Sequence, residues 1–215
     1  MTLVSLLDYF QDCSTFHSED VGVGVDYLMD RHLVWVLCSW QIVVERYPKL
    51  SERVKIGTSP YEFKNFLGYR NFVMLTEDGE YLARANSLWS LLDTRTGKPA
   101  TPPEDMLRAY VLSERLEMDY APRKIAVPAA GNDRGVITVK KHHLDTNNHV
   151  NNGRYVDMAM EFLPENFAIR QMRAEYKKQA HLDDVLYPYV AEENDRLVVA
   201  LRDEAGRPYV VVEFE

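Results

Sequence analysis

The chain has 215 residues, of which 46% are hydrophobic, and this is enough to fill the core of one large domain or of two small ones. Its formal net charge of −8, with no basic stripe interleaved with aromatic residues, argues against nucleic-acid binding. The two cysteines lack a framework spacing, which argues against a disulfide-stapled secreted protein. No signal peptide opens the sequence and no apolar stretch approaches the ~20 residues of a membrane helix, so we expect a cytoplasmic protein.

The first part of the chain is predicted to be a helix followed by strands. Residues 3–20 are expected to be helical because apolar side chains recur on one face, at Leu3, Leu6, Leu7, Phe10 and Cys13. Three strand-like runs follow, at residues 34–46, 53–64 and 72–93. The last run contains Asp78-Gly79, a dipeptide typical of a tight hairpin.

The second part repeats this order of elements. A strand is predicted at Val136–Val139 and a helix at Asn152–Leu163, and four further strands are expected at residues 171–179, 185–191, 197–202 and 209–214. Between the two parts, the proline-rich segment 96–132 is predicted to be a linker with a short charged helix at 104–117. We therefore expect an α+β protein with an internal duplication, divided into residues 1–95, the linker 96–132, and residues 133–215.

A dense run of polar residues, Leu144 to Tyr155, lies between the strand and the helix of the second part. Asp145, Asn147 and His149 stand at alternate positions, so in an extended loop their side chains would leave on one side. Asn151 or Asn152 can cap the following helix by accepting its first free N–H groups. The run is thus expected beside backbone donors and the positive end of a helix dipole, where an oxyanion could be held.

These residue types suit acyl transfer to water. A histidine can take or give a proton at neutral pH, an amide can polarise a carbonyl or fix a water, and a carboxylate can orient the imidazole or activate the water. No covalent nucleophile is evident, because Cys13 and Cys38 lie far away in the sequence.

The same residues have other interpretations. His142, His143, Asp145 and His149 could bind zinc or iron, but the intervening asparagines are poor ligands, so we expect no metal. The asparagines could form only a turn and a helix cap, although a cap needs one of them. His17, His32 and His181 have no evident partners and are expected to be structural.

The pattern Asp145-x-Asn147-x-His149-Val150-Asn151-Asn152, followed by Tyr155, resembles the active-site run of the acyl-acyl carrier protein thioesterases. The stretch from Trp35-Val36-Leu37 to Tyr47-Pro48 and the stretch from Trp89 to Thr96 are similar to strands of that family's first half. The resemblance implies a tandem hot-dog fold, in which each half is a long helix wrapped by an antiparallel sheet. It further implies hydrolysis of the thioester that ends fatty-acid synthesis, without a cofactor, with the catalytic turn in the second half and the acyl chain bound by the first.

Two departures from the family pattern qualify this resemblance. Plant members carry a Glu-Cys pair on the strand after the helix, and its positions fall on Gln179 and Ala180. Gln179 could hold a water, which leaves Asp145 or His149 to remove the proton. The first half also lacks an opening strand, so either the chain is truncated or its sheet is one strand short, with an exposed edge that could pair with a second copy as a homodimer.

The expected partner is an acylated acyl carrier protein, which is itself acidic, so docking would need a local basic patch. The candidates are Lys140, Lys141, Arg154, Arg173, Lys177 and Lys178, although about half of them are expected to be ordinary surface charges. Three alternatives remain open at this point, namely an acyl-CoA thioesterase, a hot-dog dehydratase or hydratase, and a non-catalytic acyl-binding module.

Overall fold

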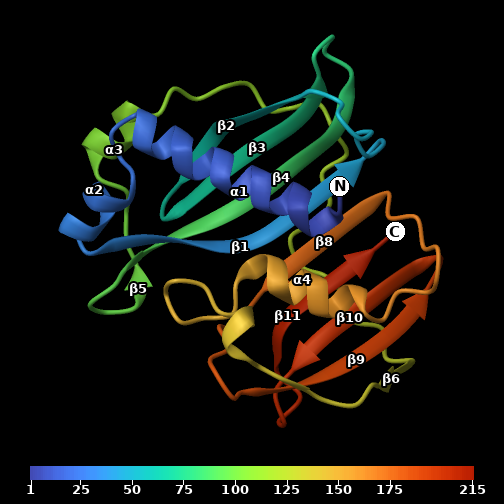
Figure 1. Cartoon of the computed structure of the whole chain (residues 1–215). Helices are drawn as coiled ribbons and strands as arrows, with labels where there is room; N and C mark the ends of the chain where they lie inside the picture. Colours follow the sequence, from blue (N-terminus) through green and yellow to red (C-terminus); the bar gives the residue numbers. More distant parts are fainter. The chain divides into compact units, whose positions relative to one another are not determined.

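The computed structural model describes residues 1–215 and divides the chain into two compact units, Met1–Tyr120 and Ala121–Glu215. In each unit a helix lies against one face of an antiparallel sheet (Figure 1). The boundary falls inside the segment 96–132.

Unit 1 begins with helix α1, Leu3–Asp20, in agreement with the predicted helix. Its sheet has the strand order β2-β3-β4-β1, and neighbouring strands are antiparallel. The bounds of its other elements are α2 Val25–Asp30, β1 Leu33–Val44, β2 Val54–Lys64, β3 Leu67–Thr76, β4 Tyr81–Asp93, β5 Lys98–Pro99 and α3 Glu104–Ala109.

The predicted run 72–93 consists of two strands, β3 and β4, with Asp78-Gly79 in the hairpin between them. Gly79 has a φ of 91°, which is accessible to glycine without strain. Strand β3 starts earlier than predicted, at Leu67, because Asn65 adopts a left-handed φ of 55° and turns the chain directly after β2. The short helix α2 was not predicted.

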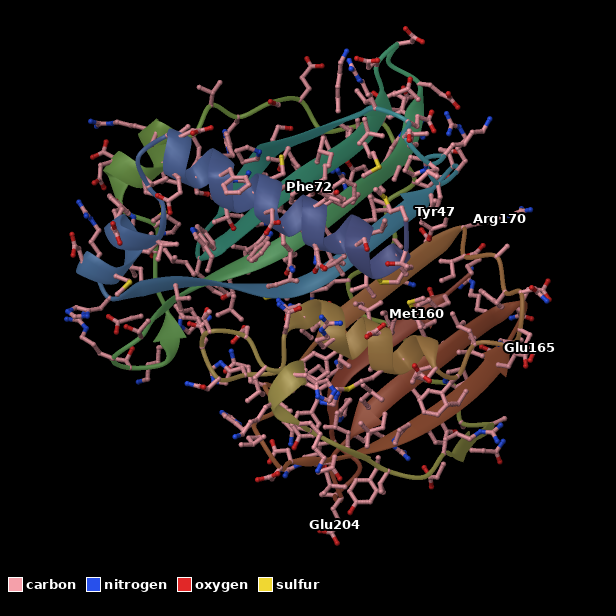
Figure 2. The ribbon with its side chains drawn as sticks, in the orientation of Figure 1. Tyr47, Phe72, Met160, Glu165, Arg170 and Glu204 are labelled. Carbon is pink, nitrogen blue, oxygen red and sulfur yellow. The ribbon has the colours of Figure 1, made fainter.

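Three aromatic rings form the centre of the unit 1 core beneath α1. The ring centroid of Phe72 on β3 lies 5.3 Å from that of Phe10 on α1 and 4.8 Å from that of Trp40 on β1. Phe72 is labelled in Figure 2. The α1 residues Leu3, Leu6, Leu7 and Phe10 are fully buried, whereas Cys13 is half-buried. The apolar stripe read from the sequence is therefore the face that packs on the sheet.

The segment after β5 is part of unit 1. The buried side chain of Asn71 on β3 accepts hydrogen bonds from Leu116 N, at 3.0 Å, and from the Tyr120 hydroxyl, at 3.1 Å. Ser113 N donates to Pro60 O of β2 at 3.0 Å, so this segment also contacts the outer strand of the unit 1 sheet. Helix α3 ends at Ala109, and the predicted helix to residue 117 is therefore too long.

Unit 2 contains helix α4, Asn152–Met160, which contacts β10 and β11. The sheet order is β8-β11-β10-β9-β6, and β7 pairs separately with β9. The remaining bounds are β6 Gly131–Asp133, β7 Ile137–Thr138, the 3₁₀ helix η1 Lys141–His143, β8 Gln171–Tyr176, β9 Val185–Glu193, β10 Arg196–Arg202 and β11 Pro208–Phe214. Helix α4, β7 and β8 are each shorter than predicted, and β6 was not predicted.

The segment that enters unit 2 is fixed to its sheet. Ile125 is buried against Val198, Ala200 and Val211, and its backbone N–H donates to the Glu175 carboxylate at 3.2 Å. The connecting segment around Ile125 therefore packs on the unit 2 sheet. None of the helices in either unit combines the length and the apolar character that a membrane span requires.

Candidate functional site

The polar run predicted from the sequence forms a compact turn between η1 and α4. Leu144 and Val150 pair across it, and Asp145 N donates to His149 O at 2.8 Å. Asn148, at its tip, has a left-handed φ of 60°. The loop is therefore not extended, and Asp145, Asn147 and His149 do not simply alternate along a strand.

The side chain of Asp145 explains this shape. Its Oδ1 accepts hydrogen bonds from the backbone N–H groups of Asn147, at 2.8 Å, and His149, at 3.3 Å. This is the local side-chain-to-backbone bonding with which aspartate favours turns over extended structure. Asp145 and His149 are half-buried, and Asn147 is exposed at the surface of the turn.

Asn151 is the N-cap of α4, as the sequence allowed. Its side chain accepts a hydrogen bond from Gly153 N at 2.8 Å, and Asn152 is the first helical residue. Asn152 O accepts a hydrogen bond from the Tyr176 hydroxyl at 3.1 Å. The turn thus leads directly into the positive end of the α4 dipole.

Gln179 lies in the segment that follows β8, because β8 ends at Tyr176. This segment is joined to the turn through Ala180, whose O accepts a hydrogen bond from Val150 N at 2.9 Å. Ala180 N in turn donates to the hydroxyl of Tyr155 on α4 at 2.7 Å, and burial raises the pKa of that hydroxyl. The structure therefore fixes the backbone of Ala180, next to Gln179, to the polar turn, and the side chain of Gln179 is exposed.

His181, which we expected to be structural, also lies at this site. Its ring meets that of His149 edge to face, with centroids 4.8 Å apart and an interplanar angle of 75°. Its backbone N–H donates to Asp184 Oδ2 at 2.9 Å, and its Nδ1 lies 3.9 Å from the same oxygen. In the sequence, the only sign that His181 lies at this site is its position directly after the Gln179-Ala180 pair.

The four candidate metal ligands are not brought together in one cluster. His142 and His143 lie side by side in η1, with ring centroids 4.1 Å apart. His143 Nδ1 accepts a hydrogen bond from Lys140 N at 3.0 Å, and burial and the nearby His142 and Arg154 lower its pKa. No three histidine, cysteine, aspartate or glutamate side chains are grouped so that they could hold a metal ion.

The basic candidates differ in their environment. Arg173 is buried, and its guanidinium is paired with Glu213 at 2.7 Å, so it is not available to a docking partner. Lys177 is paired with Glu175 at 2.8 Å and Lys178 with Asp203 at 2.6 Å. Arg154 is exposed and forms only a long contact, of 3.4 Å, with Asp157.

Two units, each with a helix on an antiparallel sheet, and a polar turn at the N-terminus of the second unit's helix define a tandem hot-dog protein. Solved structures share this fold. The acyl-ACP thioesterase of Bacteroides thetaiotaomicron superposes with a TM-score of 0.91 at 23% identity, covering 100% of this chain and 89% of the other. The 12:0-ACP thioesterase of Umbellularia californica superposes with a TM-score of 0.87, also at 23% identity and with the same coverage.

Residues 1–110 match the model of the acyl-ACP thioesterase N-terminal domain, and residues 129–209 match that of the C-terminal domain. The chain therefore belongs to the acyl-ACP thioesterase family. It is 27% identical to the dodecanoyl-acyl-carrier-protein hydrolase of Cinnamomum camphora over 202 residues. This matched region covers 86% of this chain and 53% of that protein. The chain thus spans about half the length of the curated relatives that it matches.

Proposed function

We propose that this protein hydrolyses the thioester of fatty acyl groups carried by acyl carrier protein and releases the free fatty acid. The observation that carries the proposal is the compact turn of Asp145, Asn147 and His149 at the N-terminus of α4. Membership of the acyl-ACP thioesterase family supports the substrate class.

The turn provides donors for the carbonyl oxygen of a thioester. The exposed amide of Asn147 and an imidazole N–H of His149 would stabilise the negative charge that develops on this oxygen. Water attacks the carbonyl carbon, the C–S bond breaks, and the thiol leaves with one proton while the acyl group keeps the hydroxyl. No acyl-cysteine can form at position 180, because Ala180 stands where plant relatives are expected to carry a cysteine.

Unit 1 contains no counterpart of the polar turn, and by the family resemblance we assign acyl-chain binding to it. The carrier protein would dock through the exposed side chains of Lys140 and Lys141, which directly precede the turn, and of Arg154, which directly follows it. These cations replace Arg173 in the proposed docking surface, since Arg173 is buried in an ion pair.

A thiol-release assay with matched acyl-carrier-protein and acyl-CoA substrates tests the proposal. We expect release of both thiol and free fatty acid, with a higher kcat/KM for the carrier-bound substrate. A higher kcat/KM for acyl-CoA would instead identify an acyl-CoA thioesterase. Water addition to, or loss from, the acyl chain with the thioester intact would indicate a lyase, and binding without any product would indicate an acyl-binding module.

A further inference from the structure

The site lacks an evident acceptor for the proton of the attacking water. Gln179, at the position where the family resemblance implies a glutamate, is not basic. Asp145 Oδ1 already accepts two backbone hydrogen bonds, which hold the turn in shape. His149 is needed near the carbonyl oxygen if it acts as proposed above, so the base must be sought among the neighbours of these residues.

His181 is held beside His149 by the backbone. Val150 N donates to Ala180 O at 2.9 Å, and the two histidines are the residues on either side of this hydrogen bond, one before Val150 and one after Ala180. Their rings therefore lie edge to face, with centroids 4.8 Å apart. His181 reaches the same place as the Gln179-Ala180 pair, since it directly follows it.

The carboxylate of Asp184 lies beside the backbone and the ring of His181. Asp184 Oδ2 accepts the backbone N–H of His181 at 2.9 Å and lies 3.9 Å from its Nδ1, and the Tyr209 hydroxyl of β11 lies 3.5 Å from the same oxygen. A carboxylate near Nδ1 favours the tautomer with the proton on Nδ1, which leaves Nε2 free to accept one. Such contacts are often long in a free enzyme and shorten when substrate is bound.

We propose that His181, oriented by Asp184, is the general base of the reaction, and this rests on the proposed thioester hydrolysis. Nε2 of His181 takes a proton from water as the water oxygen bonds to the carbonyl carbon. The C–S bond then breaks, and the proton passes from Nε2 to the leaving thiolate, so that His181 returns to its neutral form. Asn147 and His149 face the carbonyl oxygen in the same step.

The test compares His181→Gln with His142→Gln, a matched control at an exposed histidine in η1 of the same unit. General acid–base groups contribute about 10²–10⁴ in rate, so kcat for an acyl thioester should fall by about this factor in His181→Gln. The His142→Gln variant should keep the wild-type kcat, and both variants should keep the wild-type melting temperature.

Restoring the family's carboxylate gives a second, independent readout. In the His181→Gln background, Gln179→Glu should recover at least about tenfold in kcat, because a carboxylate would again stand next to the water. Added imidazole should also raise the rate of His181→Gln but not that of wild type. A purely structural role of His181 predicts neither recovery.

A comparison of kcat with KM tests Asp184 as a positioning residue. Asp184→Asn should lower kcat for an acyl thioester, because the ring of His181 loses the carboxylate beside its Nδ1, and should leave KM unchanged. The other groups beside this pair, His149 of the turn and Tyr209 of β11, stay in place in this variant. A wild-type kcat in folded Asp184→Asn would show that Asp184 does not position His181.

The outcomes separate this inference from the proposed function. If wild-type protein hydrolyses no acyl thioester, the proposed function fails. If wild type is active and folded His181→Gln keeps the wild-type kcat, the function stands and the role of His181 is wrong. A low rate that neither imidazole nor Gln179→Glu raises would likewise overturn the role of His181 as a base.

Discussion

Asp145 shows how one side chain can shape the backbone of the site. Its carboxylate accepts hydrogen bonds from the backbone N–H groups of Asn147 and His149 and so fixes the backbone position of both residues. The sequence suggested a carboxylate that orients an imidazole or activates water. In the structure, the carboxylate that lies next to an imidazole is that of Asp184, next to His181.

Replacing Gln179 by Glu restores the residue that the family pattern places there. We expect activity that is maintained or raised, most clearly above the ordinary pKa of a glutamate, because a second base would then be ionised near the water. The pH dependence of kcat/KM for an acyl thioester measures this. Loss of all activity in a folded variant would show that Gln179 acts as a hydrogen-bond donor, which a carboxylate cannot replace.

His17 of α1 forms an unusual buried contact in unit 1. Arg70, which is only 7% exposed, places its Nη1 3.0 Å from His17 Nδ1 and 3.3 Å from Thr58 Oγ1, and has no carboxylate partner. Burial, together with the charge of Arg70, lowers the pKa of His17 below its ordinary value of 6.5. The neutral ring can accept the guanidinium N–H, whereas a protonated ring would repel it.

This contact predicts a pH dependence of stability. Because the folded-state pKa of His17 is lowered, the unfolded chain binds the proton more readily than the folded one. The contribution of His17 to the unfolding free energy is therefore fully present above pH 6.5 and is lost as the pH falls below it. His17→Gln keeps an acceptor for Arg70. Between about pH 7.5 and 5.5, its unfolding free energy should therefore fall by less than that of wild type. Urea unfolding at both values measures the difference.

Ion pairs elsewhere contribute equally in wild type and His17→Gln, so they do not affect the comparison. His142→Gln is the control variant, because its histidine lies outside this contact. Equal losses in wild type and His17→Gln would mean that His17 is not the group that senses the proton.

At the scale of the elements, Asn71 connects strand β3 of the unit 1 sheet to the segment that follows α3. Its side chain donates to Ala85 O at 3.2 Å and accepts hydrogen bonds from Leu116 N and the Tyr120 hydroxyl. These tertiary hydrogen bonds replace those of a longer helix, which explains why α3 ends at Ala109 rather than near residue 117. Helix propensity alone cannot reveal such a competition.

Asn71→Ala removes these bonds and leaves Leu116 N without its partner, whereas the Tyr120 hydroxyl can still donate to Leu116 O at 2.7 Å. The expected cost is about 1–3 kcal/mol of unfolding free energy, the usual penalty for an unsatisfied buried polar group. Chemical unfolding measures it, with Ser113→Ala as control, since Ser113 bonds to Pro60 through its backbone only. A loss no larger than that of the control would contradict the role given to Asn71.

For the whole molecule, the sequence predicted the duplicated arrangement of helix and sheet well. The buried stripe of α1 and the Asp78-Gly79 hairpin follow from periodicity and turn chemistry. The position of the polar turn before α4 also follows from the sequence. The pairing of His149 with His181 does not, because it depends on a backbone hydrogen bond between segments 30 residues apart, Val150 N to Ala180 O.

The net charge of −8 opposes an acidic partner, so the proposed docking of the carrier protein would depend on local cations. If Lys140 and Lys141 provide them, raising the salt concentration should weaken kcat/KM for the carrier-bound substrate by on the order of tenfold, through slower encounter. A small acyl thioester should be little affected. The double substitution Lys140→Glu and Lys141→Glu should raise KM for the carrier substrate selectively. Equal salt sensitivity for both substrates would remove the basis for this docking surface.

The most direct test of the account is the rate of thiol release from acyl-acyl carrier protein by wild type, Asn147→Ala and His149→Ala, measured side by side with their melting temperatures. Both side chains lie on a polar turn, so folding should be unchanged, while each variant should lose about 10²–10³ in kcat, as expected for removal of one oxyanion donor. If wild type releases no thiol, or if either folded variant releases it at the wild-type rate, the turn before α4 is not the active site.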